Sequence, residues 1–301
     1  MSNKKKYSIG CDIGGSHISC GIIDIASGVI ENDSIVSVKV DNAAESEVIL
    51  QAWKQAINKC RNKLTADVGF VGVGLAIPGP FDYVNGIGLY DNSNQKFVHL
   101  KDVNVKKELS ELLELADSKI KFTNDATAFA LGSFWYGSGK GFQKMVAITL
   151  GTGFGSSFIY NGKAIEKGNS VPKEGCLWHI PYKDGIADDY FSTRWFVNSF
   201  NIISDEQVTG VKRIAEMAKE GNEKAIGLFN VFGENLADCL AEYLDNFKAE
   251  VVVLGGNIAE AFGLFETSLQ ESLQSKGVNV VFKVSILKES AAMLGAVTIF
   301  K

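Results

Sequence analysis

Two glycine-rich turns and the aspartate beside the first of them are the residues of this chain whose types and spacing could do chemistry. Asp12 stands two residues before the turn at residues 14–16, and a second turn follows at residues 151–153. Each turn joins two apolar segments, and glycine lets backbone amides approach an anion closely. The sequence therefore predicts two phosphate-binding hairpins. Their predicted ligands to phosphate are Gly14, Gly15, Ser16, Gly151, Thr152 and Gly153.

Asp12 indicates what the first turn could bind. A carboxylate beside a phosphate cradle repels a nucleotide unless a cation lies between them, so we interpret Asp12 as an outer-shell holder of hydrated Mg²⁺. An ordinary hairpin turn with a stabilising aspartate is the alternative. The chain has no G-x-x-x-x-G-K-[ST] motif, and no G-x-G-x-x-G motif follows its first predicted strand, so neither of these nucleotide sites competes with the interpretation.

Composition restricts the class of protein. With 301 residues and 46% hydrophobic residues, the chain is long enough for two domains with substantial cores. The net charge of -5 disfavours nucleic acid as a partner and favours a small molecule. No apolar run approaches the ~20 residues of a membrane span and no signal-like segment opens the chain, so we expect a cytoplasmic protein without a membrane partner. The five cysteines are scattered, which favours free thiols.

The hydrophobic pattern predicts the elements that must position these residues. In the first part of the chain we expect strands at 7–13, 17–25, 29–40, 69–77 and 119–123, and helices at 44–64, 105–115 and 125–136. In the second part we expect a second antiparallel meander from residue 145, helices within 188–200 and 205–247, a strand at 251–254, a helix at 257–275, a strand at 278–282 and a closing helix at 289–299. Ser204 and Gln207 are spaced as a capping box.

The order of these elements and five short motifs resemble the ROK family of sugar kinases and sugar-sensing repressors, along nearly the whole chain. The motifs are Asp12-Ile13-Gly14-Gly15-Ser16-His17-Ile18, Pro78-Gly79-Pro80-Phe81-Asp82, Asn124-Asp125-Ala126-Thr127-Ala128-Phe129-Ala130-Leu131-Gly132, Leu150-Gly151-Thr152-Gly153-Phe154-Gly155 and Leu254-Gly255-Gly256-Asn257. The resemblance implies an α/β chain with the two-domain actin-like ATPase (ribonuclease H-like) fold, with nucleotide and sugar in the cleft between the domains. We place the domains at residues 1–117, joined by the closing helix 289–301, and at residues 118–288.

The same resemblance assigns the chemistry. It implies an ATP-dependent kinase that phosphorylates a hydroxyl of a hexose or an amino sugar, with Asp125 as the general base. A carboxylate in that position takes the proton of the attacking hydroxyl. Asp125 also opens a predicted helix, where an acid that only stabilises the helix terminus is the alternative.

The resemblance extends to the substrate and nucleotide contacts. Asn124 suits a sugar hydroxyl because its amide both donates and accepts hydrogen bonds. The other predicted sugar contacts are Asn92, Asn94, His179 and Asp188, of which Asp188 is a shorter stand-in for a glutamate. A core or loop histidine is the alternative for His179. Gly255 and Gly256 would form the floor of the adenine and ribose site, unless they only form a turn.

The chain departs from the family pattern at residues 175–179. The family usually has Glu-x-Gly-His there, followed by a cysteine-rich zinc loop. Here Cys176 replaces the glutamate and Trp178 the glycine, and residues 180–185 contain no cysteine. The resemblance implies ATP and Mg²⁺ as cofactors. We expect no structural zinc, because nothing here supplies three thiolates for a tetrahedral site.

Two other functions within the family deserve comparison. A repressor needs a helix-turn-helix before the first strand, and only six residues precede Tyr7, so we expect none. A non-catalytic sugar or nucleotide sensor without a DNA-binding domain stays open as the alternative, because Cys176 and Asp188 remodel the sugar pocket. The family also implies a homodimer. The sequence leaves open which sugar and which hydroxyl react.

Overall fold

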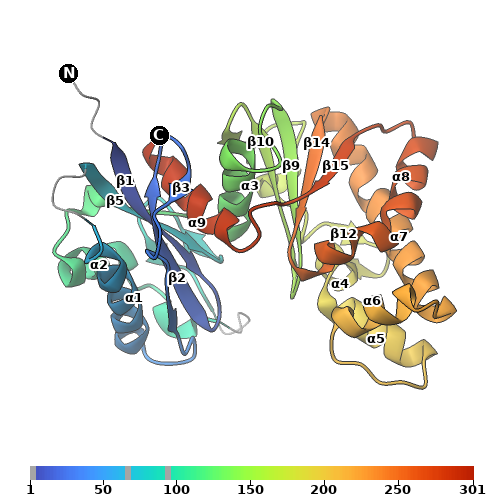
Figure 1. Ribbon diagram of the computed structural model, residues 1–301, viewed down its shortest axis with the longest axis horizontal. Helices are drawn as coiled ribbons and strands as arrows, with labels where there is room; N and C mark the ends of the chain where they lie inside the picture. Colours follow the sequence, from blue (N-terminus) through green and yellow to red (C-terminus); the bar gives the residue numbers. More distant parts are fainter. Residues whose placement is uncertain (1–4, 65–68, 92–95) are drawn as a thin grey trace. The chain divides into compact units, whose positions relative to one another are not determined.

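The structure, a computed structural model, describes residues 5–64, 69–91 and 96–301. It divides into two compact units, Met1–Tyr136 with Glu289–Lys301, and Gly137–Lys288. Each unit has its own sheet and its own hydrophobic core (Figure 1). The division follows Tyr136 and not residue 117, because the helix that ends at Tyr136 packs on the closing segment of the chain.

A six-stranded sheet forms the centre of the first unit, in the order β3-β2-β1-β5-β8, with β4 also paired to β2. Its strands are β1 (Lys6–Ile13), β2 (His17–Asp24), β3 (Val29–Ile30), β4 (Val36–Lys39), β5 (Gly69–Ile77) and β8 (Ile120–Asn124). β1 and β2 are antiparallel, whereas β1, β5 and β8 are parallel. The carboxyl ends of these three parallel strands therefore meet at one edge.

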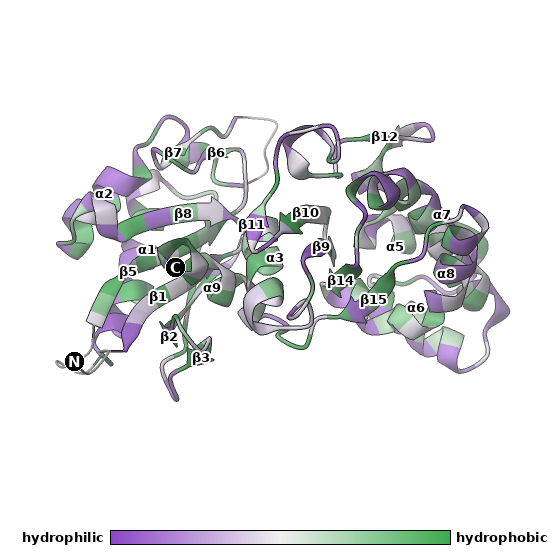
Figure 2. Ribbon diagram, turned by 90° about the horizontal axis from the view of Figure 1, so that it is seen from above, coloured by the Kyte–Doolittle hydropathy of each residue, from purple (hydrophilic) through white to green (hydrophobic). Residues whose placement is uncertain are grey.

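Helices cover both faces of this sheet. α1 (Ser46–Arg61) and α2 (Val105–Leu113) pack on one face, and α3 (Asp125–Tyr136) and α9 (Ser290–Ala296), which continues into the 3-10 helix η5 (Val297–Phe300), pack on the other. Hydrophilic and hydrophobic residues mix along α2, as they do along α6 (Val211–Lys219) and α8 (Glu266–Ser275) of the second unit (Figure 2). This mixture is typical of helices that bury one face.

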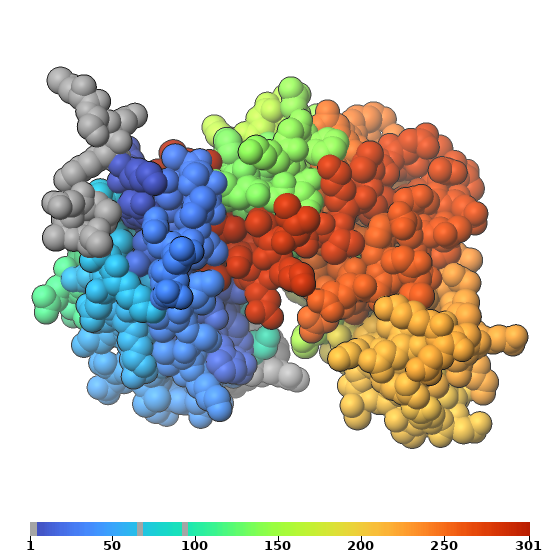
Figure 3. All heavy atoms as spheres, in the orientation of Figure 1, coloured from blue at the N-terminus to red at the C-terminus, as the bar shows by residue number. Residues whose placement is uncertain are grey.

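The second unit is built on a five-stranded sheet in the order β11-β10-β9-β14-β15. Its strands are β9 (Lys144–Leu150), β10 (Phe154–Tyr160), β11 (Lys163–Ala164), β14 (Val251–Gly255) and β15 (Val281–Val284). The helices are α4 (Ala187–Tyr190), α5 (Thr193–Ile203), α6, α7 (Glu223–Phe247) and α8, with the 3-10 helix η4 (Asn257–Leu264). Phe196, Phe229 and Phe232 are fully buried and join α5 to α7. α5, α6 and the segment between them (gold) lie at the surface of this unit (Figure 3).

Four predicted elements are interrupted in the structure. One is the helical segment expected at 205–247, which divides into α6 and α7. The expected strand at 29–40 splits into β3 and β4, because the polar residues between them turn at Asp33, whose φ is +55°. The expected helix at 257–275 splits into η4 and α8 at Phe265, where φ is -127°. The expected helix at 188–200 splits between α4 and α5.

The predicted capping box at Ser204 is wrong. Ser204 follows the last residue of α5, and the next helix begins only at Val211. The side chain of Asn201 binds both the N–H and the carbonyl of Val208, at 2.8 and 3.0 Å, and so holds the intervening segment as a loop. The described part of the chain includes no helix that is apolar over the length of a bilayer.

Candidate active site

The carboxyl edge of the first sheet brings Asp12, Asn124 and Asp125 together. Asp12 is the penultimate residue of β1, and its register partner on β5 is Ala76. The next residue of β5, Ile77, pairs with Asn124 at the end of β8. Asp125 is the first residue of α3, so the parallel pairing places the predicted base at the same edge as the predicted magnesium ligand.

Asn124 fixes the start of α3. Its Oδ1 accepts hydrogen bonds from the N–H groups of Ala126 and Thr127, at 3.0 and 3.1 Å, as a helix-capping side chain does. Its Nδ2 donates to the hydroxyl of Tyr83 at 3.1 Å. Asp125 Oδ1 accepts from the N–H of Ala126 at 2.9 Å. The cap therefore holds the carboxylate of Asp125 in one place at the first turn of α3.

The two aspartates share a poorly hydrated environment. Burial raises the pKa of Asp12 to about 7, and the negative charges of Asp125 and Glu289 add to this rise. Burial also raises the pKa of Asp125, while the N–H of Ala126 and the ammonium of Lys96 hold it down. A raised pKa makes a carboxylate a better proton acceptor. A cation bound here would relieve the repulsion between the carboxylates.

The first glycine turn joins β1 to β2 as predicted. The N–H of Gly14 donates to the carbonyl of His17 at 2.9 Å, which closes the hairpin, and Ser16 Oγ lies 2.9 Å from His17 Nδ1. Sequence reasoning missed Lys96, whose side chain lies against Gly15. Asn92 and Asn94, shortly before it, were predicted as sugar contacts, but no local pattern brings residue 96 to residue 15.

The second glycine turn is held by side chains from α4 and α5. The carbonyl of Gly151 accepts from the N–H of Thr193 at 2.7 Å and from its hydroxyl at 2.9 Å. Asp188 Oδ1 accepts from the N–H of Phe154 at 2.7 Å, and Asp188 Oδ2 lies 3.4 Å from Arg194. Asp188, predicted to bind sugar, therefore has its carboxylate turned toward the second glycine turn.

His179 lies in the segment beside Asp188, since the N–H of Asp188 donates to the carbonyl of Trp178 at 3.0 Å. Cys176 Sγ lies 3.7 Å from His179 Nδ1, and the Trp178 and His179 rings meet edge to face at 5.2 Å. Burial raises the pKa of the Cys176 thiol to about 11, so the thiol is neutral where the family carries a carboxylate. Trp178 is 47% exposed.

Gly255 and Gly256 lie beside the second glycine turn. β14 runs parallel to β9, and Gly255 pairs with Thr149. Gly256 has a φ of +83°, and a β-carbon there would overlap the backbone of Leu150, the residue before the turn. Only glycine permits this approach. The two motifs of the second unit thus meet at the carboxyl ends of adjacent strands.

Two predicted contacts, Asn92 and Asn94, lie outside the described residues. Within residues 5–64, 69–91 and 96–301, no three His, Cys, Asp or Glu side chains form a group able to hold a metal ion. Asp12 could hold Mg²⁺ only with the help of water and phosphate oxygens, which are the ligands that this ion usually keeps.

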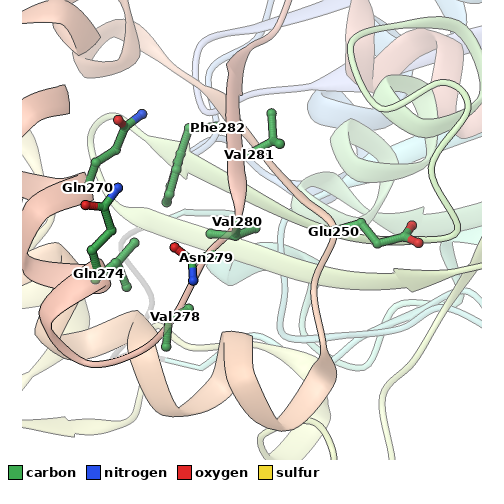
Figure 4. Close-up of a pocket in the computed structure, with 9 residues that line it drawn as sticks. Glu250, Gln270, Gln274, Val278, Asn279, Val280, Val281 and Phe282 are labelled. Atoms are coloured by element: carbon green, nitrogen blue, oxygen red, sulfur yellow. The ribbon is translucent and has the colours of Figure 1, made fainter.

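A pocket of about 440 Å³ lies elsewhere on the second unit, between α8 and β15 (Figure 4). Gln270 and Gln274 line it from the helix, and residues 278–282 line it from the strand and the segment before it. It opens near the amino end of β15, whereas the second glycine turn follows the carboxyl end of β9, which lies on the other side of β14 and parallel to it. The pocket is therefore not the site of the predicted chemistry.

Comparison with known proteins finds relatives that match most of this chain. The glucokinase of Thermotoga maritima is 26% identical, over 97% of this chain and 96% of the relative. The N-acetyl-D-glucosamine kinase of Haemophilus influenzae is 24% identical, over 85% of this chain and 86% of the relative. The crystal structure of a ROK family glucokinase from Streptomyces griseus, in complex with glucose and AMPPNP, has a TM-score of 0.75 and 22% identity, over 97% of this chain and 98% of that chain.

These comparisons confirm the predicted fold class, the actin-like ATPase fold. The model of the ROK family matches residues 8–301, nearly the whole chain. The expectation drawn from the five motifs is thereby confirmed, and the chain belongs to the ROK family.

Proposed function

We propose that this protein is an ATP-dependent sugar kinase that phosphorylates a hydroxyl of a hexose or an amino sugar, with Asp125 as the general base. Its relatives named glucokinase and N-acetyl-D-glucosamine kinase support the reaction class. The observation that carries the assignment is the position of Asp125. It lies poorly hydrated at the carboxyl edge of the first sheet, beside Asp12 and fixed by the cap at Asn124.

The chemistry follows from this placement. Asp125 accepts the proton of the sugar hydroxyl while the hydroxyl oxygen attacks the γ-phosphorus of ATP. The amides at Gly14, Gly15 and Ser16 are proposed ligands to phosphate oxygens, and so are the amides of residues 151–153. Gly255 and Gly256 line the adenine and ribose site. The glycines serve this purpose because they let the backbone approach the phosphates.

Asp12 is the proposed holder of Mg²⁺, through water. The residues present fit a hydrated cation, since Asp12 is a buried carboxylate that faces the negative charges of Asp125 and Glu289. When bound, Mg²⁺ would neutralise charge on the phosphates.

The sugar contacts that we propose are Asn124, His179 and Asp188, with Asn92 and Asn94. The neutral Cys176 thiol and the exposed Trp178 ring stand beside His179, so this part of the pocket is less charged than the family's glutamate would make it. A homodimer and a cytoplasmic location stay predictions from the sequence.

The test is ADP release from MgATP by the full chain, across a panel of hexoses, N-acetylhexosamines and fructose. A no-sugar blank measures ATP hydrolysis. Sugar-dependent ADP release, with the phosphorylated sugar detected by mass spectrometry, is the expected result. Folded protein that releases ADP at the blank rate with every sugar would contradict the proposal.

A further inference from the structure

Lys96 reaches the first glycine turn from a distant part of the sequence. A β-carbon built on Gly15 would lie 3.0 Å from Lys96 Cε and 3.3 Å from its Cδ. The side chain thus occupies the space that any side chain at position 15 would need. The end of an exposed lysine is thereby brought to the backbone that we propose as a phosphate cradle.

The next residue anchors this lysine. Phe97 is fully buried, with a φ of +57°, and its ring packs against Trp53 and Tyr90 at centroid distances of 5.8 Å each. The N–H of Phe97 donates to the carbonyl of Asn42 at 3.1 Å, and Asn42 Nδ2 donates to the carbonyl of Gly15. The same asparagine therefore ties both the glycine turn and the backbone beside Lys96, so the approach is built into the fold.

The carboxylates around this turn leave a role for a positively charged side chain. Asp12 faces the negative charges of Asp125 and Glu289. Among the described groups whose charge acts on Asp12 or Asp125, Lys96 is the positive one. It lies near enough to Asp125 for its ammonium to oppose the rise in the pKa of that carboxyl. A triphosphate held at the turn would therefore meet Lys96 and the base together.

We propose that the ammonium of Lys96 binds a γ-phosphate oxygen of ATP and stabilises the charge of that phosphoryl group during transfer. This inference rests on the proposed kinase function. The sugar oxygen bonds to the γ-phosphorus as the bond to the β,γ-bridging oxygen breaks, and that electron pair leaves with ADP. Asp125 takes the hydroxyl proton, and Lys96 keeps its own. Lysine and arginine commonly stabilise transferring phosphoryl groups in this way.

Measurements of nucleotide binding distinguish this role of Lys96 from a purely structural one. AMPPNP carries a γ-phosphate and ADP does not, so calorimetry of both ligands isolates the contact. Lys96→Met should weaken AMPPNP binding about 10- to 100-fold, the range of a charge-assisted hydrogen bond, and should change ADP binding less than about twofold. Lys101→Met, another exposed lysine of the same segment, is the matched control and should change neither affinity. Equal weakening of both ligands, or of neither, by Lys96→Met would overturn the inference.

Turnover provides the second measurement. Lys96→Met should lower kcat about 10²-fold or more and leave the KM for sugar nearly unchanged, as loss of one transition-state donor does. Lys96→Arg should recover much of the loss, because it keeps the charge. An active wild type whose kcat survives Lys96→Met would refute the role of Lys96 and leave the kinase function standing. A wild type inactive toward every sugar would refute the kinase function, while the AMPPNP comparison would still test Lys96.

Discussion

At the scale of single residues, the carboxylates of Asp12 and Asp125 make the first unit's proposed site unfavourable without its ligands. Burial and mutual repulsion raise the pKa of Asp12 to about 7. The unfolded chain has the ordinary value near 3.8. Between about pH 4 and pH 7 the folded protein keeps a proton that the unfolded chain releases, so the free energy of unfolding falls as the pH rises. Stored repulsion of this kind is typical of functional sites.

Asp12→Asn should therefore stabilise the protein in EDTA at pH 8, on the order of 2–4 kcal/mol, and leave its stability unchanged near pH 4. Urea unfolding at both values measures the effect. Asp117→Asn, at an exposed position, is the control and should show no such pH dependence. A loss of stability at pH 8 in Asp12→Asn would contradict the repulsion.

Asp188 allows two roles to be separated. Its Oδ1 holds the N–H of Phe154 beside the second glycine turn, so Asp188→Ala should raise the KM for ATP about tenfold, by the cost of that hydrogen bond. The neighbouring Asp189, which also contacts Arg194, supplies the control Asp189→Ala, with little change in the same KM. Steady-state kinetics with both substrates varied gives the answer. A rise confined to the KM for sugar would contradict the role of Asp188 at the turn and leave only its proposed contact with sugar.

The positions of residues inside the sequence motifs could be predicted, whereas contacts between residues far apart in the sequence could not. Asp12 and the two glycine turns were predictable because each lies beside a strong apolar strand. The contact of Lys96 with Gly15 was not predicted, because it depends on Phe97 filling the hydrophobic core. No local spacing in the sequence encodes that packing.

At the scale of elements, the first unit depends on close packing where the helices α3 and α9 cross. A β-carbon at Gly132 of α3 would overlap the carbonyl oxygen of Ala291, and one at Gly295 of α9 would overlap that of Ala128. The helices therefore pack backbone against backbone. Small residues in the closing segment permit this close packing, but the sequence does not say against which element they pack.

Gly295→Ala should destabilise the protein by about 1–3 kcal/mol or more, because neither backbone can yield cheaply. Gly227→Ala makes the same change in the helix α7, where a β-carbon would meet open space, and should leave stability unchanged or raise it by up to about 1 kcal/mol. Thermal unfolding compares the two variants. Equal melting temperatures of the two variants would contradict the close packing of α3 on α9.

The elements themselves were largely predictable. β5 and α3 have the predicted bounds, since each has a clear apolar pattern between polar or proline punctuation. The misplaced boundaries lie where tertiary contacts override local pattern, as at Ser204, whose capping spacing is preempted by the bond between Asn201 and Val208.

At the scale of the whole molecule, the order of the elements along the chain was enough to predict the fold. Two meanders, each followed by parallel strands, indicated the family that the comparisons then confirmed. The boundary between the units was misplaced because α3 looks like the start of a second half, yet packs with the returning segment Glu289–Lys301.

Asp125 is tested most directly as the base by comparing wild type with Asp125→Asn in sugar-dependent ADP release. We expect the variant to lose about 10²–10⁴-fold in kcat, with sugar and nucleotide affinities retained in calorimetry. Full activity in the variant would contradict the assignment of Asp125 as the base.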